Sequence, residues 1–249
     1  MINPLVSIII ASYNSEITII KTLDSIYNQT YQNFELIIID GKSTDGTIDL
    51  IKSYESIFYN KIKWISEKDD GIYDAWNKGI SISSGIWISF IGSDDYYERN
   101  ALENYVKIIN SNKNINFISS KCLLVDCNYK KVREYGLKWS DRMRSYCAIA
   151  HVGSFHKRDL FVKSPFFDLR YKITADYDFL LKNKDIIRPY FFPIITAVVL
   201  NTGISGRDIF FVAKERTTVK IRNKSKSIFL CYVDYFDIIL KFYFRKYFL

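Results

Sequence analysis

The segment Trp87-Ile-Ser-Phe-Ile-Gly-Ser-Asp-Asp-Tyr-Tyr97 predicts the fold of this chain more clearly than any other stretch. Its first half is a continuous apolar run, which is typical of a strand buried on both faces of a parallel sheet. Two adjacent carboxylates, Asp94 and Asp95, follow that run. Because open α/β sheets bind ligands at the carboxyl ends of their strands, a carboxylate pair at this point is suited to hold a hard divalent cation against phosphate oxygens.

Strands and helices alternate on both sides of this segment. Apolar runs predict further strands, and apolar residues at three- and four-residue steps predict helices between them. This alternation predicts an α/β fold with a mostly parallel sheet flanked by helices. The expected strands are Val6–Ala11, Phe34–Asp40, Ile62–Ser66 and Trp87–Ile91, and the expected helices are Glu16–Gln29, Thr47–Ser56, Ile72–Ile82 and Asn100–Asn110.

The second half of the chain is less regular. A hairpin is expected from Phe117–Val125 and Lys130–Tyr135, a helix at Thr174–Lys182 and a strand at Tyr190–Leu200. Residues 209–249 stand apart as a helical, basic and aromatic tail. We therefore expect one domain over residues 1–208, followed by an amphipathic helical tail.

The composition excludes several other classes of protein. With 249 residues, of which 48% are hydrophobic, the chain is long enough for one large core. Its four cysteines lack metal-ligand spacing, and a domain of this size needs no disulfide framework, so a reducing compartment is expected. The first residues show no charged segment or cleavage pattern of a signal peptide, and we expect a cytoplasmic protein.

The loop after the first strand, Ser12-Tyr13-Asn14-Ser15, argues against a dinucleotide-binding fold. The Gly-x-Gly-x-x-Gly fingerprint of such folds would stand here, and this loop has no glycine. Tyr13 could instead stack on a base while backbone groups bind a ribose. An ordinary turn capped by Asn14 or Ser15 explains the same residues.

Polar side chains also follow the second and third expected strands. Asp40 closes the second strand and is suited to accept a hydrogen bond from a base or a sugar, whereas Asp45 is expected to shape the turn. After the third strand, Lys78 could reach a diphosphate. Because Asp74 and Lys78 are four residues apart on an expected helix, a surface ion pair is the alternative.

The chain resembles the family 2 glycosyltransferases with the GT-A fold, over about residues 3–208. The resemblance is greatest to bacterial enzymes of surface-polysaccharide synthesis, such as that of the O-antigen of lipopolysaccharide. It is carried by Val6-Ser-Ile-Ile-Ile-Ala-Ser-Tyr-Asn14, Ile39-Asp-Gly-Lys-Ser-Thr-Asp-Gly-Thr47, Glu67-Lys-Asp-Asp-Gly-Ile-Tyr-Asp-Ala-Trp-Asn-Lys-Gly79, Gly92-Ser-Asp-Asp95, His151-Val-Gly-Ser-Phe155 and Thr174-Ala-Asp-Tyr-Asp-Phe-Leu-Leu-Lys182.

This resemblance implies a nucleotide-diphosphate sugar donor, commonly a UDP-sugar, bound within residues 1–110, and an acceptor bound within residues 111–208. Gly92 stands where many family members carry the first Asp of an Asp-x-Asp motif, so Asp94 and Asp95 are the carboxylates that would hold Mn²⁺ or Mg²⁺. Asp70 matches a variable position. The positions that match nucleotide-sugar-binding residues are Ser12, Tyr13, Asn14, Asp40, Asp69, Lys78, Asp94 and Asp95.

The resemblance also implies a catalytic base near the start of the helix at 174–182. Asp176 aligns with the Asp of the family's Glu-Asp form, in which Ala175 replaces the Glu, and Asp178 is the next candidate. Both acids also suit the N-terminus of a helix because of the helix dipole. His151 and Arg207 match positions near the acceptor or the diphosphate, and a structural histidine and a surface loop are the alternatives.

The tail carries most of the excess positive charge. From Arg207 to Leu249 there are ten Lys or Arg and four Asp or Glu, a net charge of +6 out of +8 for the whole chain. Asp234, Asp237 and Lys241 would each cost about 2.5–3.5 kcal/mol at the centre of a membrane span. With Arg245 they form a polar stripe, so this helix is expected to lie in a membrane interface, or else to pack on the catalytic domain or on a second subunit of a homodimer. No nucleic-acid-binding motif accompanies the charge.

The sequence thus predicts a metal-dependent, inverting glycosyltransferase, peripheral on the inner face of the cell membrane. It would move a hexosyl or N-acetylhexosaminyl group from a nucleotide-sugar to a hydroxyl of a lipid-linked saccharide. One alternative is a sugar-1-phosphate nucleotidyltransferase, which normally needs a Gly-rich basic loop after the first strand. The other is a catalytically inactive membrane-bound scaffold of the same fold, against which the retention of Asp94, Asp95 and Asp176 argues.

Overall fold

The computed structural model of the chain describes residues 5–163, 166–201 and 208–248. Within these residues nine strands form one sheet in the order β3-β2-β1-β4-β8-β6-β9-β5, with β7 paired to β6 beside this path. The strands are β1 Val6–Ser12, β2 Phe34–Asp40, β3 Ile62–Ser66, β4 Trp87–Gly92, β5 Tyr96–Tyr97, β6 Phe117–Val125, β7 Lys131–Tyr135, β8 Ser154–Lys157 and β9 Pro189–Leu200. The helices are α1 Ile19–Tyr27, α2 Thr47–Ser53, α3 Glu55–Phe58, α4 Ile72–Ile82, α5 Ala101–Ser111, α6 Asp159–Lys163, α7 Ala175–Lys182, α8 Ile209–Arg222 and α9 Ile228–Phe248, with a 3₁₀ turn at Asp141–Arg144.

The long strands of the sheet end at one common edge. β1 pairs in parallel with β2 and β4, and β2 pairs in parallel with β3, which confirms the parallel sheet predicted for the first half. β8 is antiparallel to both β4 and β6, so β6 runs in the same direction as β4, and β9 is parallel to β6. The carboxyl ends of β1, β2, β3, β4, β6 and β9 therefore share the edge at which α/β sheets bind ligands.

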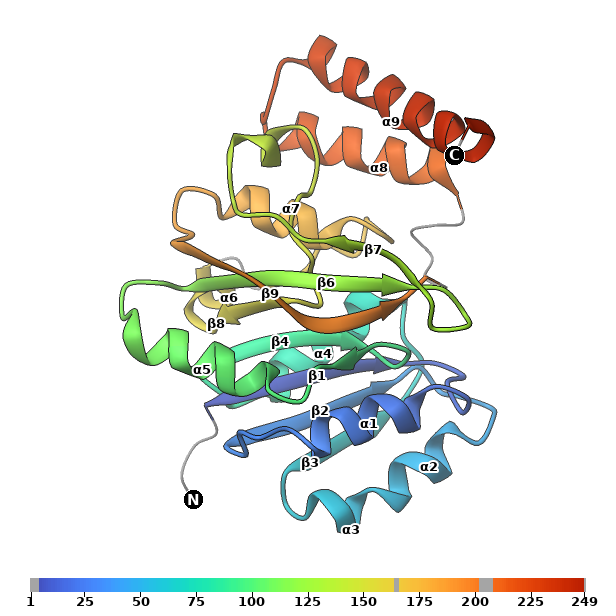
Figure 1. Cartoon of the computed structure of the whole chain (residues 1–249), viewed down its shortest axis with the longest axis vertical. Coiled ribbons are helices and arrows are strands. Elements are labelled where there is room, and N and C mark those ends of the chain that lie inside the picture. Colours follow the sequence, from blue (N-terminus) through green and yellow to red (C-terminus); the bar gives the residue numbers. More distant parts are fainter. Residues whose placement is uncertain (1–4, 164–165, 202–207, 249) are drawn as a thin grey trace.

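Side chains that alternate along β1 divide the core between the two faces of the sheet. Ile8 and Ile10 pack into a cluster with Leu23 of α1. Ile9 points the other way, into a second cluster with Trp76 of α4. Each completely buried isoleucine contributes roughly 1.5–3 kcal/mol to the hydrophobic stabilisation. Figure 1 shows the matching layers, with α1 and α5 in front of the sheet and α4 behind it.

The elements predicted in the first half are confirmed with small shifts. β2, β3 and α4 have the predicted ends. α1 begins at Ile19 rather than at Glu16, because the N–H groups of Thr18 and Ile19 bond to the carbonyl of Ser15 in a preceding turn. The helix predicted at 47–56 is instead two helices, α2 and α3, which meet at Tyr54.

Among the elements that the sequence did not predict, β8 matters most. It pairs with β4 on one side and with β6 on the other, so it joins the parallel half of the sheet to the rest. Its four residues, Ser154–Lys157, are too few to show a strand periodicity. β5, α6 and the 3₁₀ turn are missing from the prediction for the same reason.

The residues after 208 form a helical hairpin of α8 and α9 (Figure 1). Asn223, at the end of α8, donates a hydrogen bond of 2.7 Å to Asp178 of α7. The completely buried ammonium of Lys220 lies 2.9 Å from the carboxylate of Asp234 in α9, and Lys226 lies 3.2 Å from the same carboxylate. α8 is therefore the layer that joins α9 to the rest of the molecule.

Within the part of the chain that the structure describes, no helix combines the length and the apolar character that a membrane crossing needs.

Candidate active site

The polar residues that end β1, β2 and β3 lie side by side. The strand register places Ser12 beside Asp40, and Asp40 beside Ser66. The buried carboxylate of Asp40 accepts hydrogen bonds of 2.8 Å from the hydroxyl of Ser66 and from the N–H of Ser43. These bonds tie the loops after β2 and β3 together. A contact between Asp40 and a base or sugar stays a prediction.

Tyr13 and Asp69 approach each other over Gly41. A Cβ atom at Gly41 would lie 2.8 Å from Oδ2 of Asp69 and 3.3 Å from the ring of Tyr13. Tyr13 is 64% exposed, so its ring is accessible for stacking. Burial raises the pKa of the half-buried Asp69 carboxyl. An exposed ring beside a partly desolvated carboxylate can bind a nucleoside by stacking and hydrogen bonding.

Asn14 shapes the loop that carries Tyr13. Its backbone is in the left-handed region, with φ of 46°, which asparagine tolerates better than most residues. Its N–H donates to the hydroxyl of Ser43 at 2.8 Å, and its side-chain oxygen accepts from the N–H of Thr44 at 2.9 Å. Ser12 is buried beneath this loop. The structure thus shows the turn role of Asn14 that the sequence allowed as an alternative.

Asp94 and Asp95 fold back over the end of β4. A Cβ atom at Gly92 would lie 2.8 Å from Oδ1 of Asp94 and 3.2 Å from Oδ2 of Asp95, so the missing side chain of Gly92 leaves room for both carboxylates. The N–H of Leu200, at the end of β9, donates to Oδ1 of Asp95 at 3.1 Å. Burial, together with the charge of Asp94, raises the pKa of Asp95 to about 8.

This carboxylate pair fits a divalent cation that also binds a diphosphate. Mg²⁺ is commonly bound by one or two carboxylates together with substrate phosphates, and two converging carboxylates supply that number of protein ligands. A cation would also offset the cost of burying the charge of Asp95 beside Asp94. Among the described residues, no group of three or more His, Cys, Asp or Glu side chains could hold a metal by itself. Asp94 and Asp95 are therefore the residues that would hold Mn²⁺ or Mg²⁺, with the substrate completing the coordination.

Asp176 lies in the first turn of α7. Its Oδ1 accepts a hydrogen bond of 2.8 Å from the N–H of Tyr177, and the hydroxyl of Tyr73 lies 3.1 Å from the same oxygen. Its Oδ2 lies 3.9 Å from Nδ1 of His151. The Asp176 side chain remains 19% exposed, so its carboxylate is held by neighbours yet open to a substrate.

His151 connects Asp176 to β4. Its ring stacks on Phe90, with centroids 5.4 Å apart, and lies against Trp76 at 4.9 Å. Phe90 is two residues before Gly92, where β4 ends, and the Asp94–Asp95 pair follows after Ser93. Burial lowers the pKa of His151, so the ring is neutral at pH 7. The structure thus brings Asp176 beside the strand that carries the carboxylate pair.

Tyr73 and Asn77 belong to the motif Glu67–Gly79, but the sequence predicted no role for either of them. The Tyr73 hydroxyl donates to the carbonyl of Ile173 at 2.7 Å. Asn77 exchanges two hydrogen bonds of 2.9 Å with the backbone of Phe167. Their spacing of four residues places both side chains on one face of α4. This spacing is visible in the sequence. The residues that Tyr73 and Asn77 bind, however, lie 100 and 90 residues further along the chain, so their roles could not be predicted from it.

Two candidate residues have structural partners. Asp178 is buried, forms an ion pair with Lys182, and accepts a hydrogen bond from Asn223. Lys78 lies 2.9 Å from Glu67 and 3.4 Å from Asp74, which is the surface ion pair that the sequence offered as the alternative. Catalysis by Asp178 and diphosphate binding by Lys78 stay predictions.

Arg207 lies outside the described residues.

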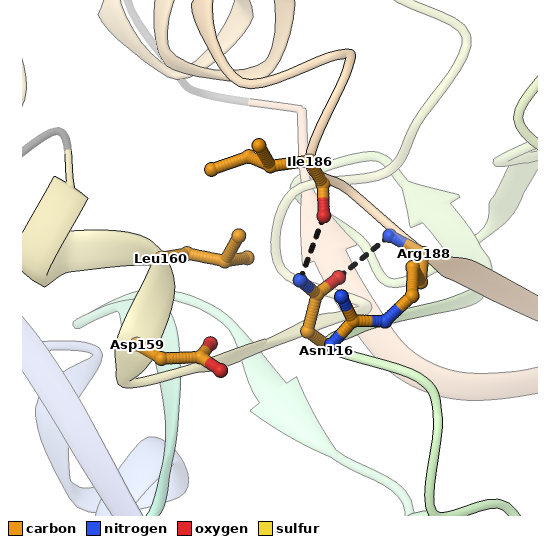
Figure 2. A pocket seen from close by; sticks show the side chains of 5 residues that line it. All are labelled: Asn116, Asp159, Leu160, Ile186 and Arg188. Carbon is orange, nitrogen blue, oxygen red and sulfur yellow. Dashed lines mark hydrogen bonds between the residues drawn. The ribbon is translucent and has the colours of Figure 1, made fainter.

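A small cavity elsewhere in the molecule has no connection with these residues (Figure 2). It has a volume of about 30 Å³, with room for about two water molecules. It lies where β6 and β9 begin, at the sheet edge opposite to the carboxylate pair. Its walls are Asn116, Asp159, Leu160, Ile186 and Arg188.

The sheet and the helices that flank it form the fold of the GT-A glycosyltransferases. The chain belongs to the family described as Glycosyl transferase family 2, whose sequence profile matches residues 7–156. It is 29% identical over 210 residues to a PGL/p-HBAD biosynthesis glycosyltransferase of Mycobacterium bovis, covering 83% of this chain and 81% of that protein. It is also 29% identical to the glycosyltransferase GlyA of Streptococcus pneumoniae, over 65% of this chain and 25% of that protein.

Solved structures of low sequence identity share the fold. TarS 1-349 of S. aureus in complex with UDP-GlcNAc matches with a TM-score of 0.72 and 18% identity, over 94% of this chain and 71% of that chain. The mannosyltransferase PcManGT from Pyrobaculum calidifontis, in complex with GDP-Man and Mn²⁺, matches with a TM-score of 0.69 and 19% identity, over 90% and 65% of the two chains. A longer TarS structure is matched over 39% of its chain.

Proposed function

We propose that this glycosyltransferase moves a sugar from a nucleotide-diphosphate sugar, such as a UDP-sugar, to a hydroxyl of a lipid-linked saccharide, with inversion at the anomeric carbon. The observation that carries the proposal is the placement of Asp176. Its carboxylate lies 3.9 Å from the ring of His151, which stacks on Phe90 of β4, the strand whose end carries the Asp94–Asp95 pair. A base and a diphosphate-binding pair at one sheet edge are what a single displacement needs.

The proposed reaction is one in-line step. The Asp176 carboxylate takes the proton of the acceptor hydroxyl while the acceptor oxygen bonds to the anomeric carbon. The bond from that carbon to the diphosphate oxygen breaks, and its electron pair leaves with the nucleoside diphosphate. Attack on the face opposite to the leaving group inverts the centre. The family match favours this transfer over the nucleotidyltransferase alternative.

The remaining residues have supporting roles in this proposal. Tyr13 and Asp69 are suited to bind the nucleoside beside Gly41. Asp94 and Asp95 would hold Mn²⁺ or Mg²⁺, which, when bound, neutralises the charge that develops on the departing diphosphate. The solved complexes of TarS with UDP-GlcNAc and of PcManGT with GDP-Man and Mn²⁺ support a donor and a metal of these classes.

A membrane surface is the proposed partner of α9. The outward face of this helix is apolar, with Phe229 75% exposed and Phe236 60% exposed. Exposed basic side chains flank it on α8 and in the following turn, which suits the anionic inner face of a cell membrane. This placement would bring a lipid-linked acceptor close to the enzyme. The exposed apolar residues of α9 are Ile228, Phe229, Leu230, Tyr232, Val233, Phe236, Leu240, Tyr243 and Phe244.

The test measures nucleotide binding and turnover in two variants. We expect Asp95→Ala to lose the Mn²⁺-dependent thermal shift that UDP gives in the wild type. Asp176→Asn should keep that shift and lose about 10²–10⁴-fold in nucleotide release from UDP-GlcNAc, UDP-Glc, UDP-Gal or GDP-Man. Asp185→Asn, an exposed position just before β9, is the matched control and should change neither quantity. Unchanged turnover in both site variants would reject the assignment.

A further inference from the structure

Glu215 of α8 makes an unusual set of contacts with the start of α7. Its Oε1 accepts from the N–H of Lys172 at 2.7 Å. Its Oε2 accepts from the N–H of Ile173 at 2.9 Å, and from both the N–H and the hydroxyl of Thr174 at 3.1 Å. Glu215 is only 7% exposed. One buried carboxylate therefore binds three successive backbone amides and a side chain that lie about 40 residues before it.

One of these bonds satisfies the N–H of Thr174, which α7 cannot pair within itself, and the others hold the two residues before the helix. The first N–H groups of a helix have no partner within the helix, and an N-cap side chain usually accepts one of them. Thr174 stands at the N-cap of α7 but makes no side-chain cap bond. The negative charge of Glu215 lies at the positive end of the helix dipole, where it is favourable. α8 therefore fixes where α7 begins.

The segment held by Glu215 is also the segment that determines where Asp176 lies. Asp176 follows Thr174 by two residues. The carbonyl of Ile173 accepts the hydrogen bond of Tyr73, whose hydroxyl also approaches Asp176. A shift of residues 172–174 would thus move the Asp176 carboxylate and its neighbour together. A displacement of about 1 Å at such a position can cost roughly 100-fold in rate.

We propose that Glu215 is a positioning residue for the base Asp176. In this proposal α8 helps to place the base, in addition to joining α9 to the rest of the molecule. This inference rests on the proposed function of Asp176. The four hydrogen bonds of Glu215 described above all go to residues 172–174, and none goes to the Asp94–Asp95 pair. We therefore expect donor binding not to depend on Glu215.

The test compares Glu215→Gln with Glu215→Asp in the full-length protein. The amide of Gln retains one acceptor oxygen and turns an NH₂ group toward backbone donors, so nucleotide release from UDP-GlcNAc with Mn²⁺ should fall about 10- to 100-fold in kcat. Its KM for UDP-GlcNAc should stay within about twofold. Asp keeps the charge and should lose less than Gln. Glu103→Gln, an exposed ion-pair position on α5, is the control and should behave as the wild type.

Hydrogen exchange supplies a readout that does not need activity. In Glu215→Gln the amides of residues 172–174 should exchange at least about tenfold faster, while those of β1 and β4 keep their rates. If Glu215→Gln does not fold, Thr174→Val takes its place, because it removes one of the four bonds at a buried site and should give a smaller loss of kcat in the same direction.

Two results would overturn the inference. One is an unchanged kcat in a folded Glu215→Gln protein. The other is a parallel loss of kcat, donor affinity and global exchange protection, which would mean that Glu215 serves stability alone. If the wild type releases no nucleotide from any of the four donors, the proposed function fails instead. Hydrogen exchange at residues 172–174 in Glu215→Gln then still shows whether Glu215 holds the segment before α7.

Discussion

Replacing Glu35 with Gln should lower the stability of the sheet in a way that depends on pH. Glu35 is a β2 residue whose side chain is 7% exposed. Its carboxylate accepts from the hydroxyl of Ser7 in β1 at 2.7 Å and from the N–H of Gly85 before β4 at 3.1 Å. It also bonds to Ser84 and to the ammonium of Lys63 in β3. One charged group thus joins three neighbouring strands and the segment that leads into β4.

The pKa of Glu35 gives the magnitude. Burial alone would raise this pKa, but the bonds from Lys63, Ser7 and Ser84 lower it from 4.5 to about 2. A shift of that size corresponds to about 3 kcal/mol of stability at neutral pH. Because Lys63 is half exposed and its charge is screened by water, we expect about 2 kcal/mol. For a domain of this size the loss in Glu35→Gln amounts to roughly 4–8 °C in Tm.

The sign follows from the lowered pKa. The unfolded chain binds a proton near pH 4.5 and the folded chain only near pH 2, so this contribution is complete above pH 4.5 and is lost as the pH falls toward 2. Urea unfolding of the wild type and Glu35→Gln at several pH values between 7 and 3 measures the difference. Glu98→Gln, at an exposed position, is the control. A difference in the free energy of unfolding that is absent at pH 7, or that grows as the pH falls, would refute the reasoning.

Two further predictions concern the donor site and the tail. A Cβ at Gly41 would come within 2.8 Å of Oδ2 of Asp69, a movable side-chain end, so Gly41→Ala should weaken UDP binding by about tenfold in isothermal titration while Tm changes little. A Tm loss without a change in UDP affinity would contradict this. Phe229→Ser combined with Phe236→Ser should abolish sedimentation with anionic phosphatidylglycerol vesicles, whereas Ile57→Ser, an exposed apolar position on α3, should not. Dimerisation without vesicle binding would instead favour a second subunit as the partner of α9.

The sequence was most informative where a candidate site residue lies next to a strand end. Asp40 and the Asp94–Asp95 pair directly follow apolar runs, and parallel strands bring their carboxyl ends to one edge. Local periodicity was enough to predict β2, β3 and α4 with their observed ends. The edge that carries the proposed donor-binding residues could therefore be predicted without knowing any long-range contact.

The environment of Asp176 could not be predicted in this way. It depends on Tyr73, about 100 residues earlier, and on His151, whose ring is placed by Phe90. β8, which carries the segment after His151 into the sheet, is too short to be recognised. Glu215 was counted only among the charges of a basic tail, because nothing in its local sequence points to the start of α7.

α4 shows how the two parts of the site are joined. From the sequence, Lys78 of this helix could reach a diphosphate or form a surface ion pair with Asp74, and in the structure it pairs with Asp74 and with Glu67. Two other polar side chains of α4 contact the second half of the chain: Tyr73 donates to the carbonyl of Ile173, before α7. Asn77 binds the segment before that, at Phe167. Trp76 meanwhile packs α4 on the sheet and against His151, so one helix contacts both the strands and the neighbours of Asp176. α4 therefore contacts both the sheet and the segments that surround Asp176, whereas diphosphate binding by Lys78 stays a prediction.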